Sequence, residues 1–133
     1  MAHTTDDAHP LVRVESIVLI AIGGFAGSNL RYFTGGLLPG MAGTLVVNAL
    51  GSLALGFVLY ETMYSGVLAT ETRAVVSTGF LSSFTTYSTF ALQSAQAAPP
   101  LLIANVVANY ALGFAAVLVG RSLARHADRR WSA

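Results

Sequence analysis

The chain alternates between long uncharged stretches and short polar ones. Residues 16–30, 32–60 and 74–120 contain no Asp, Glu, Lys or Arg. A helix needs roughly 20 mostly apolar residues to cross a bilayer, so these stretches have room for four crossings. Gly- and Pro-rich turns and a short polar loop separate the crossings. The pattern predicts an all-α membrane protein with transmembrane helices at about 16–33, 44–63, 73–97 and 99–123, and polar tails at 1–13 and 124–133.

Composition supports one membrane domain over residues 1–133. The chain is 54% hydrophobic and 10% charged, whereas about 25% of the residues in a soluble domain are charged. Cysteine is absent, which excludes disulfides and thiolate metal sites. The net charge of +1 argues against a nucleic-acid partner. The polar, acidic N-terminus does not resemble the start of a secretory signal, so we expect the first apolar segment to be retained.

The arginines indicate an orientation. With four crossings, both termini and the middle loop lie on one side of the bilayer, and cytoplasmic segments are enriched in Lys and Arg. We therefore predict cytoplasmic termini in a multi-pass protein of the cell membrane. Arg31 alone falls elsewhere, and it either extends to the headgroups or attracts anions to a vestibule. The arginines on the predicted cytoplasmic side are Arg13, Arg73, Arg121, Arg125, Arg129 and Arg130.

Small and polar residues recur every four positions on three predicted helices, and residues at this spacing share one helix face. Small residues allow close packing of helices in lipid, and Asn can form hydrogen bonds between helices. For the Gly positions we favour packing, whereas for the Asn positions packing and a polar pathway are equally open. The stripes are Gly23, Gly27 and Arg31; Thr44, Asn48, Ser52 and Gly56; and Asn105, Asn109 and Gly113, with Gly120 two turns beyond.

The third predicted helix is unusually rich in hydroxyl groups. Eight of the residues from 77 to 89 are Ser or Thr, and such side chains compete for the carbonyls of the helix. The segment is therefore predicted to break at mid-membrane, where irregular backbone survives only inside protein or along a cavity. Freed carbonyls at such a break can hold a cation. The aromatic residues Phe80, Phe84, Tyr87 and Phe90 either pack together or direct their partially positive ring edges at an anion.

Four motifs resemble the Fluc/CrcB family of fluoride channels. "GFLSSFTTYSTF" (79–90) is similar to the third-helix signature, which usually reads like G-F-x-G-G-x-T-T-F-S-T-F. "GGFAGSNLRYF" (23–33) resembles the helix-one motif, and "GTLVVNALGSLALG" (43–56) the helix-two motif. "NVVANYALGFAAVLVG" (105–120) resembles the small-residue pattern of helix four. The similarity covers about residues 16–121, with the motifs in the expected order and spacing.

The resemblance implies a passive, fluoride-selective channel that lowers cytoplasmic fluoride. It also implies an antiparallel, dual-topology dimer with a structural sodium ion at the dimer interface. The main-chain oxygens of Ser82 and Thr85 would be the sodium ligands, and Arg31 would lie near the aqueous vestibule. The implied fluoride pathway contains Asn48, Tyr87, Ser88, Phe90 and Asn109.

Several positions depart from the family pattern. Ser82-Ser83 replaces Gly-Gly, Tyr87 replaces Phe, and Ala91 and Gln93 replace a usual Ser-x-Glu. Together with the arginine bias, these departures leave a homodimer and a heterodimer with a second homologue equally open. They also leave open a subunit that does not conduct alone.

A small proton-coupled cation exporter is a weaker alternative, because it needs a carboxylate within the membrane and Glu15 at a helix edge is the best candidate. An enzyme is not expected. His3, His9 and His126 lie in the predicted tails, and no buried nucleophile–base pair can be built.

Overall fold

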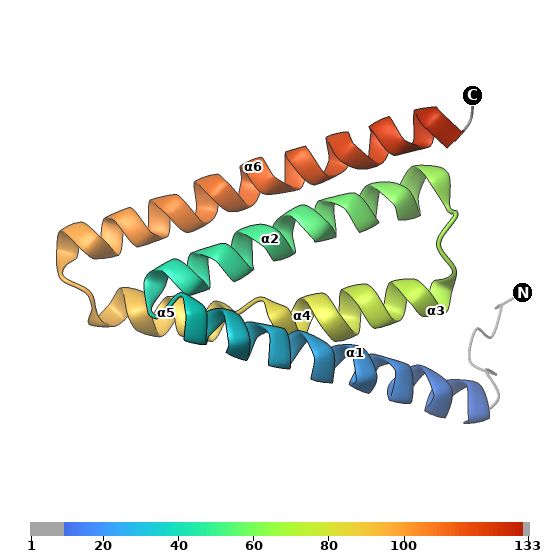
Figure 1. Cartoon of the computed structure of the whole chain (residues 1–133), viewed down its shortest axis with the longest axis horizontal. Helices are drawn as coiled ribbons and strands as arrows, with labels where there is room; N and C mark the ends of the chain where they lie inside the picture. The colour runs from blue at the N-terminus through green and yellow to red at the C-terminus, as the bar shows by residue number, and fades with distance from the viewer. Residues whose placement is uncertain (1–9, 132–133) are drawn as a thin grey trace, which may run out of the picture.

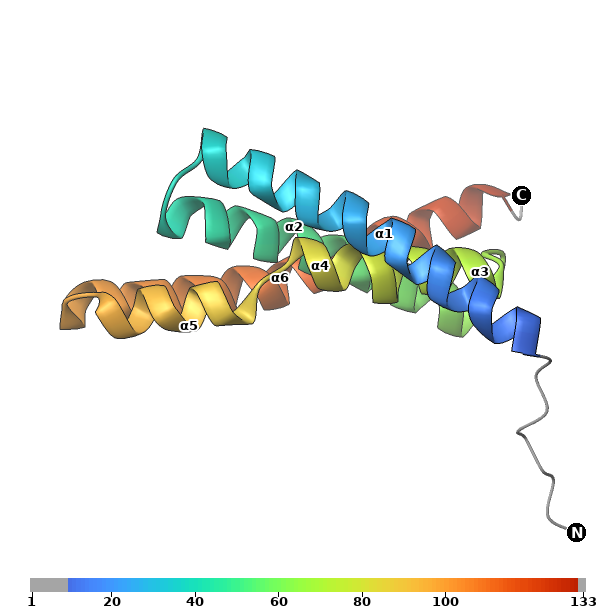
Figure 2. The ribbon, with the colours of Figure 1, turned by 90° about the horizontal axis from the view of Figure 1, so that it is seen from below.

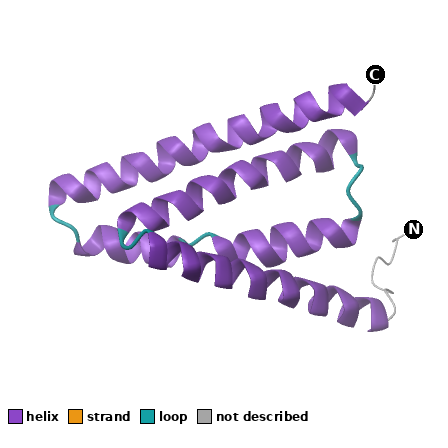
Figure 3. Ribbon diagram, viewed as in Figure 1, coloured by secondary structure: helices purple, strands orange, loops and turns teal. Residues whose placement is uncertain are grey.

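The computed structural model describes residues 10–131, and its secondary structure is helical throughout (Figures 1 and 3). Two long helices precede the segment that was predicted to break, and one long helix follows it. The first passage is α1 (Pro10–Leu37), and the second is α2 (Met41–Tyr60) with a π-helical extension η1 (Glu61–Ser65). The third consists of α3 (Thr70–Arg73), π-helical η2 (Ala74–Leu81), α4 (Ser82–Phe84) and α5 (Tyr87–Gln96), and the fourth is α6 (Pro99–Trp131).

The outer helices are longer than the sequence indicates. Helix α1 begins at Pro10, and α6 continues to Trp131, so residues 10–13 and 124–131 are helical where polar tails were predicted. Proline is well suited to the first turn of a helix. After Gly120 no Gly or Pro stops α6, and its Ala and Arg residues favour helix. The remaining tail positions, 1–9 and 132–133, lie outside the described residues.

The described helices have the length and surface of membrane-spanning segments. Pro10–Leu37, Met41–Ser65 and Pro99–Arg130 are long and apolar enough to cross a bilayer. Large apolar side chains face outward, including Phe25 at 75% exposure and Phe114 at 70%. Surfaces of this kind are rare on soluble monomers, whereas helices with all backbone groups satisfied internally suit a lipid environment. The chain is therefore a multi-pass membrane protein.

Helices pack in two pairs whose backbones approach closely. Helix α6 lies along α2, and α1 lies along η2 and α4. Glycines lie at both contacts. A methyl group on any of these glycines would overlap backbone atoms of the facing helix. This finding confirms the packing role predicted for Gly23, Gly27 and Gly56, whereas a methyl group at Gly113 would meet only Ser52 Oγ at 3.7 Å. The glycines are Gly23, Gly27 and Gly79 between α1 and the third passage, and Gly56 and Gly120 between α2 and α6.

The passages run alternately up and down. The start of α1, the η1–α3 loop and the end of α6 lie at one end of the bundle (right in Figure 1). The α1–α2 and α5–α6 turns lie at the other end. There the α1–α2 pair and the α5–α6 pair diverge (Figure 2). The regions predicted to share one side of the membrane therefore do share one end of the molecule.

Candidate functional site

The third passage changes conformation at two residues between α4 and α5. Thr85 has φ −78° and ψ 162°, and Thr86 has φ −148° and ψ 122°, so both are extended. The Thr85 N–H still donates to the Leu81 carbonyl at 3.0 Å. In a continuous helix the Thr86 N–H would donate to the Ser82 carbonyl, but here it donates to Asn48 Oδ1 at 2.8 Å. The geometry therefore frees the Ser82 carbonyl from its helical donor.

Asn48 of α2 holds Thr86 at both main-chain polar groups. Its Oδ1 accepts from the Thr86 N–H, and its Nδ2 donates to the Thr86 carbonyl at 3.0 Å. The Thr86 hydroxyl in turn caps α5 by accepting from the Thr89 N–H at 3.2 Å, as N-cap threonines do. Gly51, one turn after Asn48, leaves room for the Thr85 methyl group. A side chain on α2 thus replaces the backbone partners that an unbroken helix would supply.

A row of amides continues from Asn48 into α6. Asn48 Nδ2 also donates to Asn109 Oδ1 at 3.3 Å, and Asn109 Nδ2 donates to the Asn105 carbonyl at 2.9 Å and to Asn105 Oδ1 at 3.0 Å. Asn105 is buried and donates to Ser94 Oγ at 2.9 Å. An amide NH₂ has two hydrogens, so the Asn48 and Asn109 donors are all in use. An added ligand at Asn48 must therefore exchange with one of these bonds.

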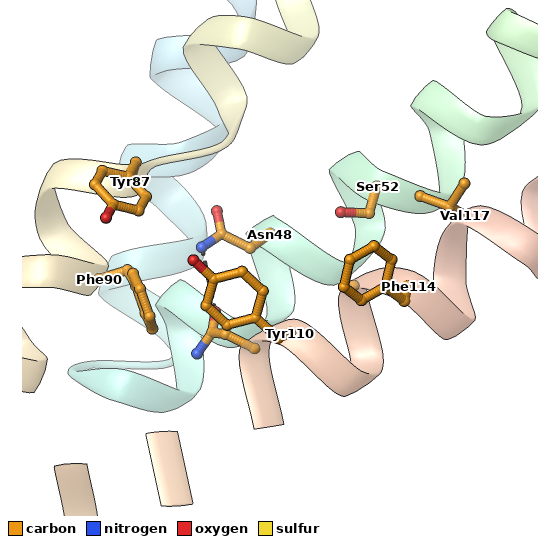
Figure 4. Close-up of a pocket in the computed structure, with 9 residues that line it drawn as sticks. Asn48, Ser52, Tyr87, Phe90, Tyr110, Phe114 and Val117 are labelled. Carbon is orange, nitrogen blue, oxygen red and sulfur yellow. Dashed lines mark hydrogen bonds between the residues drawn. The ribbon is translucent and has the colours of Figure 1, made fainter. Parts of the chain in front are cut away.

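A cavity of about 270 Å³ borders Asn48 on the side of α5 and α6. The close-up in Figure 4 shows Tyr87 and Phe90 on one side of Asn48, and Ser52 and Phe114 on the other. The Tyr87 and Phe90 ring centres are 5.8 Å apart. Phe90 is 7% exposed, whereas Tyr87 is 72% exposed. The walls combine aromatic rings with amide and hydroxyl groups, and they carry no charged side chain.

A second hollow, of about 420 Å³, lies beside the break and shares Asn48, Ser52 and Tyr87 with the first. Ser82 and Thr85 line it, so the two residues predicted to supply carbonyl ligands border one open space. Hydroxyl side chains near the break donate back to their own helix: Ser82 Oγ to the Thr78 carbonyl, and Thr85 Oγ1 to the Leu81 carbonyl at 3.1 Å. These bonds give each hydroxyl group an acceptor within its own helix, where the surrounding sequence is apolar.

Arg31 of α1 reaches the break directly. Its Nη1 donates to the Thr85 carbonyl at 3.1 Å, and the side chain is half-buried. Arg31 also lines a cavity of about 200 Å³ with Thr44, Thr86 and Gln93, where the helix pairs diverge. Gln93 Oε1 is buried without a hydrogen-bond partner among the described residues. The cavity therefore combines a fixed positive charge with neutral polar groups.

Most predicted site residues come together at the break. Asn48, Tyr87, Phe90 and Asn109 line the first cavity, and Ser82 and Thr85 line the second. Ser88 is exposed, and its hydroxyl lies 3.5 Å from Thr86 Oγ1.

The predicted site residues did not include Thr86, Ser52 and Tyr110. A threonine three positions before Thr89 at a helix start was the available signal for the Thr86 cap. Ser52, one helical turn after Asn48, was named only in a packing stripe. Tyr110 meets Phe90 edge-on at 6.2 Å, and no signal in the sequence singled it out.

The chain is similar to known proteins over most of its length. Residues 18–121 match the profile of a family described as CrcB-like protein, camphor resistance. A Haloarcula marismortui protein named fluoride-specific ion channel FluC 1 is 60% identical over 90% of this chain and 93% of its own length. Fluoride-specific ion channel FluC 2 of Halobacterium salinarum is 49% identical, over 90% of this chain and 95% of its own. These relatives are ion channels rather than enzymes, and the chain belongs to the CrcB-like family.

Proposed function

We propose that this chain forms a channel that lets fluoride leave the cytoplasm passively and so lowers fluoride toxicity. The observation that carries the proposal is the uncharged cavity at Asn48, where amide, hydroxyl and aromatic groups meet beside a break in the third passage. The names of the relatives support fluoride as the ion. A neutral polar pore suits a small anion, because it must be bound well enough to enter and weakly enough to leave.

Anion passage past Asn48 requires a hydrogen-bond exchange. Of the bonds made by Asn48, the one to Asn109 Oδ1 is the longest, at 3.3 Å. An anion can take that N–H while Asn48 keeps both bonds to Thr86. Ser52 and the hydroxyl groups of Tyr87 and Tyr110 supply further donors around the cavity. The edges of the Tyr87 and Phe90 rings are partially positive and complete an anion path without fixed charge.

The cavity at Arg31 is the proposed vestibule. In the sequence, Arg31 is the single charged residue between Glu15 and Glu61, and a low-dielectric setting extends the reach of its charge. Its bond to the Thr85 carbonyl keeps the guanidinium at the wall of the cavity, where Thr44 and Gln93 also stand. Anions would concentrate there before they meet the neutral path at Asn48.

We infer an antiparallel dimer, with the break at mid-membrane and the open hollow at Ser82 facing the partner. Neutral carbonyl oxygens suit a hard cation such as sodium, and the Ser82 carbonyl has lost its helical donor to Asn48. The Thr85 carbonyl also accepts from Arg31 and has a second lone pair for an ion. The donor set of one chain is therefore small, and carbonyls from two chains would hold sodium together. A bound sodium ion would supply positive charge that keeps these carbonyls in place.

Exchange of sodium for a large organic cation during purification tests this assignment. We expect the melting temperature and the dimer fraction to fall together, because carbonyls facing one another would lose their counter-charge. Thermal unfolding and gel filtration in detergent measure both quantities, and potassium serves as a second replacement. An unchanged melting temperature and an intact dimer without sodium would remove the ion from the proposal.

Orientation and dimer composition follow from the charge distribution. The end of the bundle with the η1–α3 loop carries six of the seven arginines, so we propose that it faces the cytoplasm in most copies. An antiparallel homodimer needs copies in both orientations. The one-sided distribution of arginines therefore favours a second homologue with the opposite distribution. A homodimer is favoured instead by the cavity of this chain, which brings Asn48, Tyr87, Phe90 and Asn109 together.

Fluoride efflux from liposomes is the test of the proposed function. Liposomes with the purified chain are loaded with fluoride or chloride, and efflux is read with ion-selective electrodes against protein-free liposomes. We expect fast loss of fluoride and retention of chloride. Efflux that appears only after co-expression with a second homologue would assign this chain to a heterodimer. Equal chloride efflux, or no fluoride efflux in either preparation, would contradict the proposal.

The cavities around the break give no support to a proton-coupled cation exporter. The three cavities around the break are lined without Asp or Glu, and such an exporter needs a carboxylate that trades protons for its cargo.

A further inference from the structure

At the opposite end of the bundle from the vestibule, the chain wraps around the carboxyl group of Glu61. Glu61 begins η1 and is 8% exposed. Its Oε1 accepts from the Leu68 N–H at 2.6 Å, and its carbonyl accepts from the Gly66 N–H at 2.7 Å. Gly66 has φ 64°, which glycine adopts without strain. The turn from 61 to 68 is therefore closed by Glu61.

The second carboxyl oxygen of Glu61 is buried and unsatisfied. Glu61 Oε2 has no hydrogen-bond partner among the described residues. Arg73 is nearby in the fold, but its Nε donates to the Leu68 carbonyl at 3.0 Å. Burial of a polar group without a partner is costly, and native structures usually resolve such a case with water or an ion. This oxygen therefore points to a missing partner with positive charge or donor hydrogens.

Glu61 lines a cavity of about 110 Å³ between η1 and the last turns of α6. Asp128 and Ser65 line the same cavity, and Phe57 and Ala124 contribute apolar wall. Two carboxylates and a hydroxyl are the oxygen groups that hard divalent cations prefer. At about 30 Å³ per water molecule, the space accommodates one ion with a few waters. Apolar side chains beside the carboxylates strengthen the attraction between charges.

We propose that this cavity binds a small divalent cation of the calcium type, held by Glu61 and Asp128. The ion would join the η1–α3 loop to the end of α6. The basic residues Arg125 and Arg129 are exposed on α6, outside the lining of the cavity. The site is separate from the break, and its residues take no part in the proposed fluoride path.

Thermal unfolding of the full chain in detergent tests the proposal. After treatment with a chelator, we expect added calcium to raise the melting temperature by several degrees in a saturable manner, as a ligand that binds only the folded state does. Glu61→Gln keeps an acceptor for the Leu68 N–H and removes the charge, so it should abolish the rise. Asp128→Asn should weaken it. Glu71→Gln is the matched control, because Glu71 is an exposed acid of α3 and should leave the rise unchanged.

Each remaining outcome decides the proposal. A rise with magnesium or manganese that Glu61→Gln removes would support the site and reassign its ion. The proposal fails if no divalent cation raises the melting temperature, if Glu61→Gln shows the same rise, or if acid alone stabilises the wild type, since Glu61 then holds a proton. If Glu61→Gln does not fold, equilibrium dialysis of the wild type decides. One calcium per chain, weakened in Asp128→Asn, supports the site, and no bound calcium overturns it.

Discussion

Asn48→Asp should abolish fluoride efflux. The new carboxylate can still accept from the Thr86 N–H, but its other oxygen would face the Thr86 carbonyl and Asn109 Oδ1, which now receive N–H bonds at 3.0 and 3.3 Å. A negative charge at this place would also repel an anion in a narrow path. We expect efflux to fall by about 100-fold or more, which corresponds to about 2.7 kcal/mol of barrier. Stability should also fall by about 1–3 kcal/mol for each acceptor left without a donor.

Asn29→Asp is the matched control for this substitution. Asn29 is an exposed amide on α1 that donates to the Phe25 carbonyl of its own helix. Fluoride efflux from liposomes and thermal unfolding in detergent are measured for both variants. Efflux from Asn48→Asp that stays within a factor of about two of the wild type would show that fluoride does not pass Asn48. A large loss in Asn29→Asp would show that any added acid on the bundle is harmful, and the result for Asn48 would then carry no site-specific meaning.

Gly27→Ala should destabilise the bundle by roughly 3 kcal/mol, at the upper end of the usual cost of overpacking. A methyl group on Gly27 would overlap the Phe80 carbonyl oxygen and lie 3.1 Å from the Phe84 nitrogen. Both contacts are backbone atoms that cannot rotate away. Helix α1 would have to move outward from η2 and α4, and the bond from Arg31 to Thr85 would lengthen with it. Thermal unfolding and recovery of the folded protein after heating would measure the effect.

Gly36→Ala provides the comparison within the same helix. A methyl group there meets nothing within 4 Å, and alanine favours helix over glycine by up to about 1 kcal/mol. We therefore expect stability to be unchanged or slightly raised. Equal destabilisation by both substitutions would show that α1 tolerates no added methyl group for reasons other than contact with Phe80.

The long helices could be predicted from the sequence because a helix that crosses lipid needs a long, uncharged and apolar stretch of residues. Gly27 and Gly56 could be assigned to packing because a small residue at a four-residue spacing has few other uses in a membrane helix. Helix ends were less predictable. A helix that leaves the bilayer does not stop there unless a residue ends it, and α6 therefore runs through Ala124 and Asp128 to Trp131.

The hydrogen-bond partners of the site residues were harder to predict than the residues themselves. Asn48 and Arg31 were identified as candidates, but nothing in one sequence specifies that they bind Thr86 and Thr85. Those contacts depend on how helices rotate against one another, which the close glycine contacts of α1 and α2 determine. The sequence indicates only a weakened helix at 77–89, because eight hydroxyl side chains compete for its carbonyls. The extended Thr85 and Thr86 also depend on their partners on α1 and α2. Glu61 lies near the end of the predicted helix 44–63, where an acid is usually solvated. Its burial depends on a left-handed Gly66 and on the length of α6.

The bonds that shape the break connect residues far apart in the chain: 38 positions separate Asn48 from Thr86, and 54 separate Arg31 from Thr85. A third passage that enters lipid alone has only its own backbone to satisfy its polar groups. An unbroken helix is then its conformation of lowest free energy. The extended conformation at Thr85 and Thr86 gains its partners only when α1 and α2 have docked. We therefore expect the break to form late in assembly, after α1 and α2 have docked. A chain whose helices pack incorrectly would lack the proposed path past Asn48, so we expect misfolded copies not to leak fluoride.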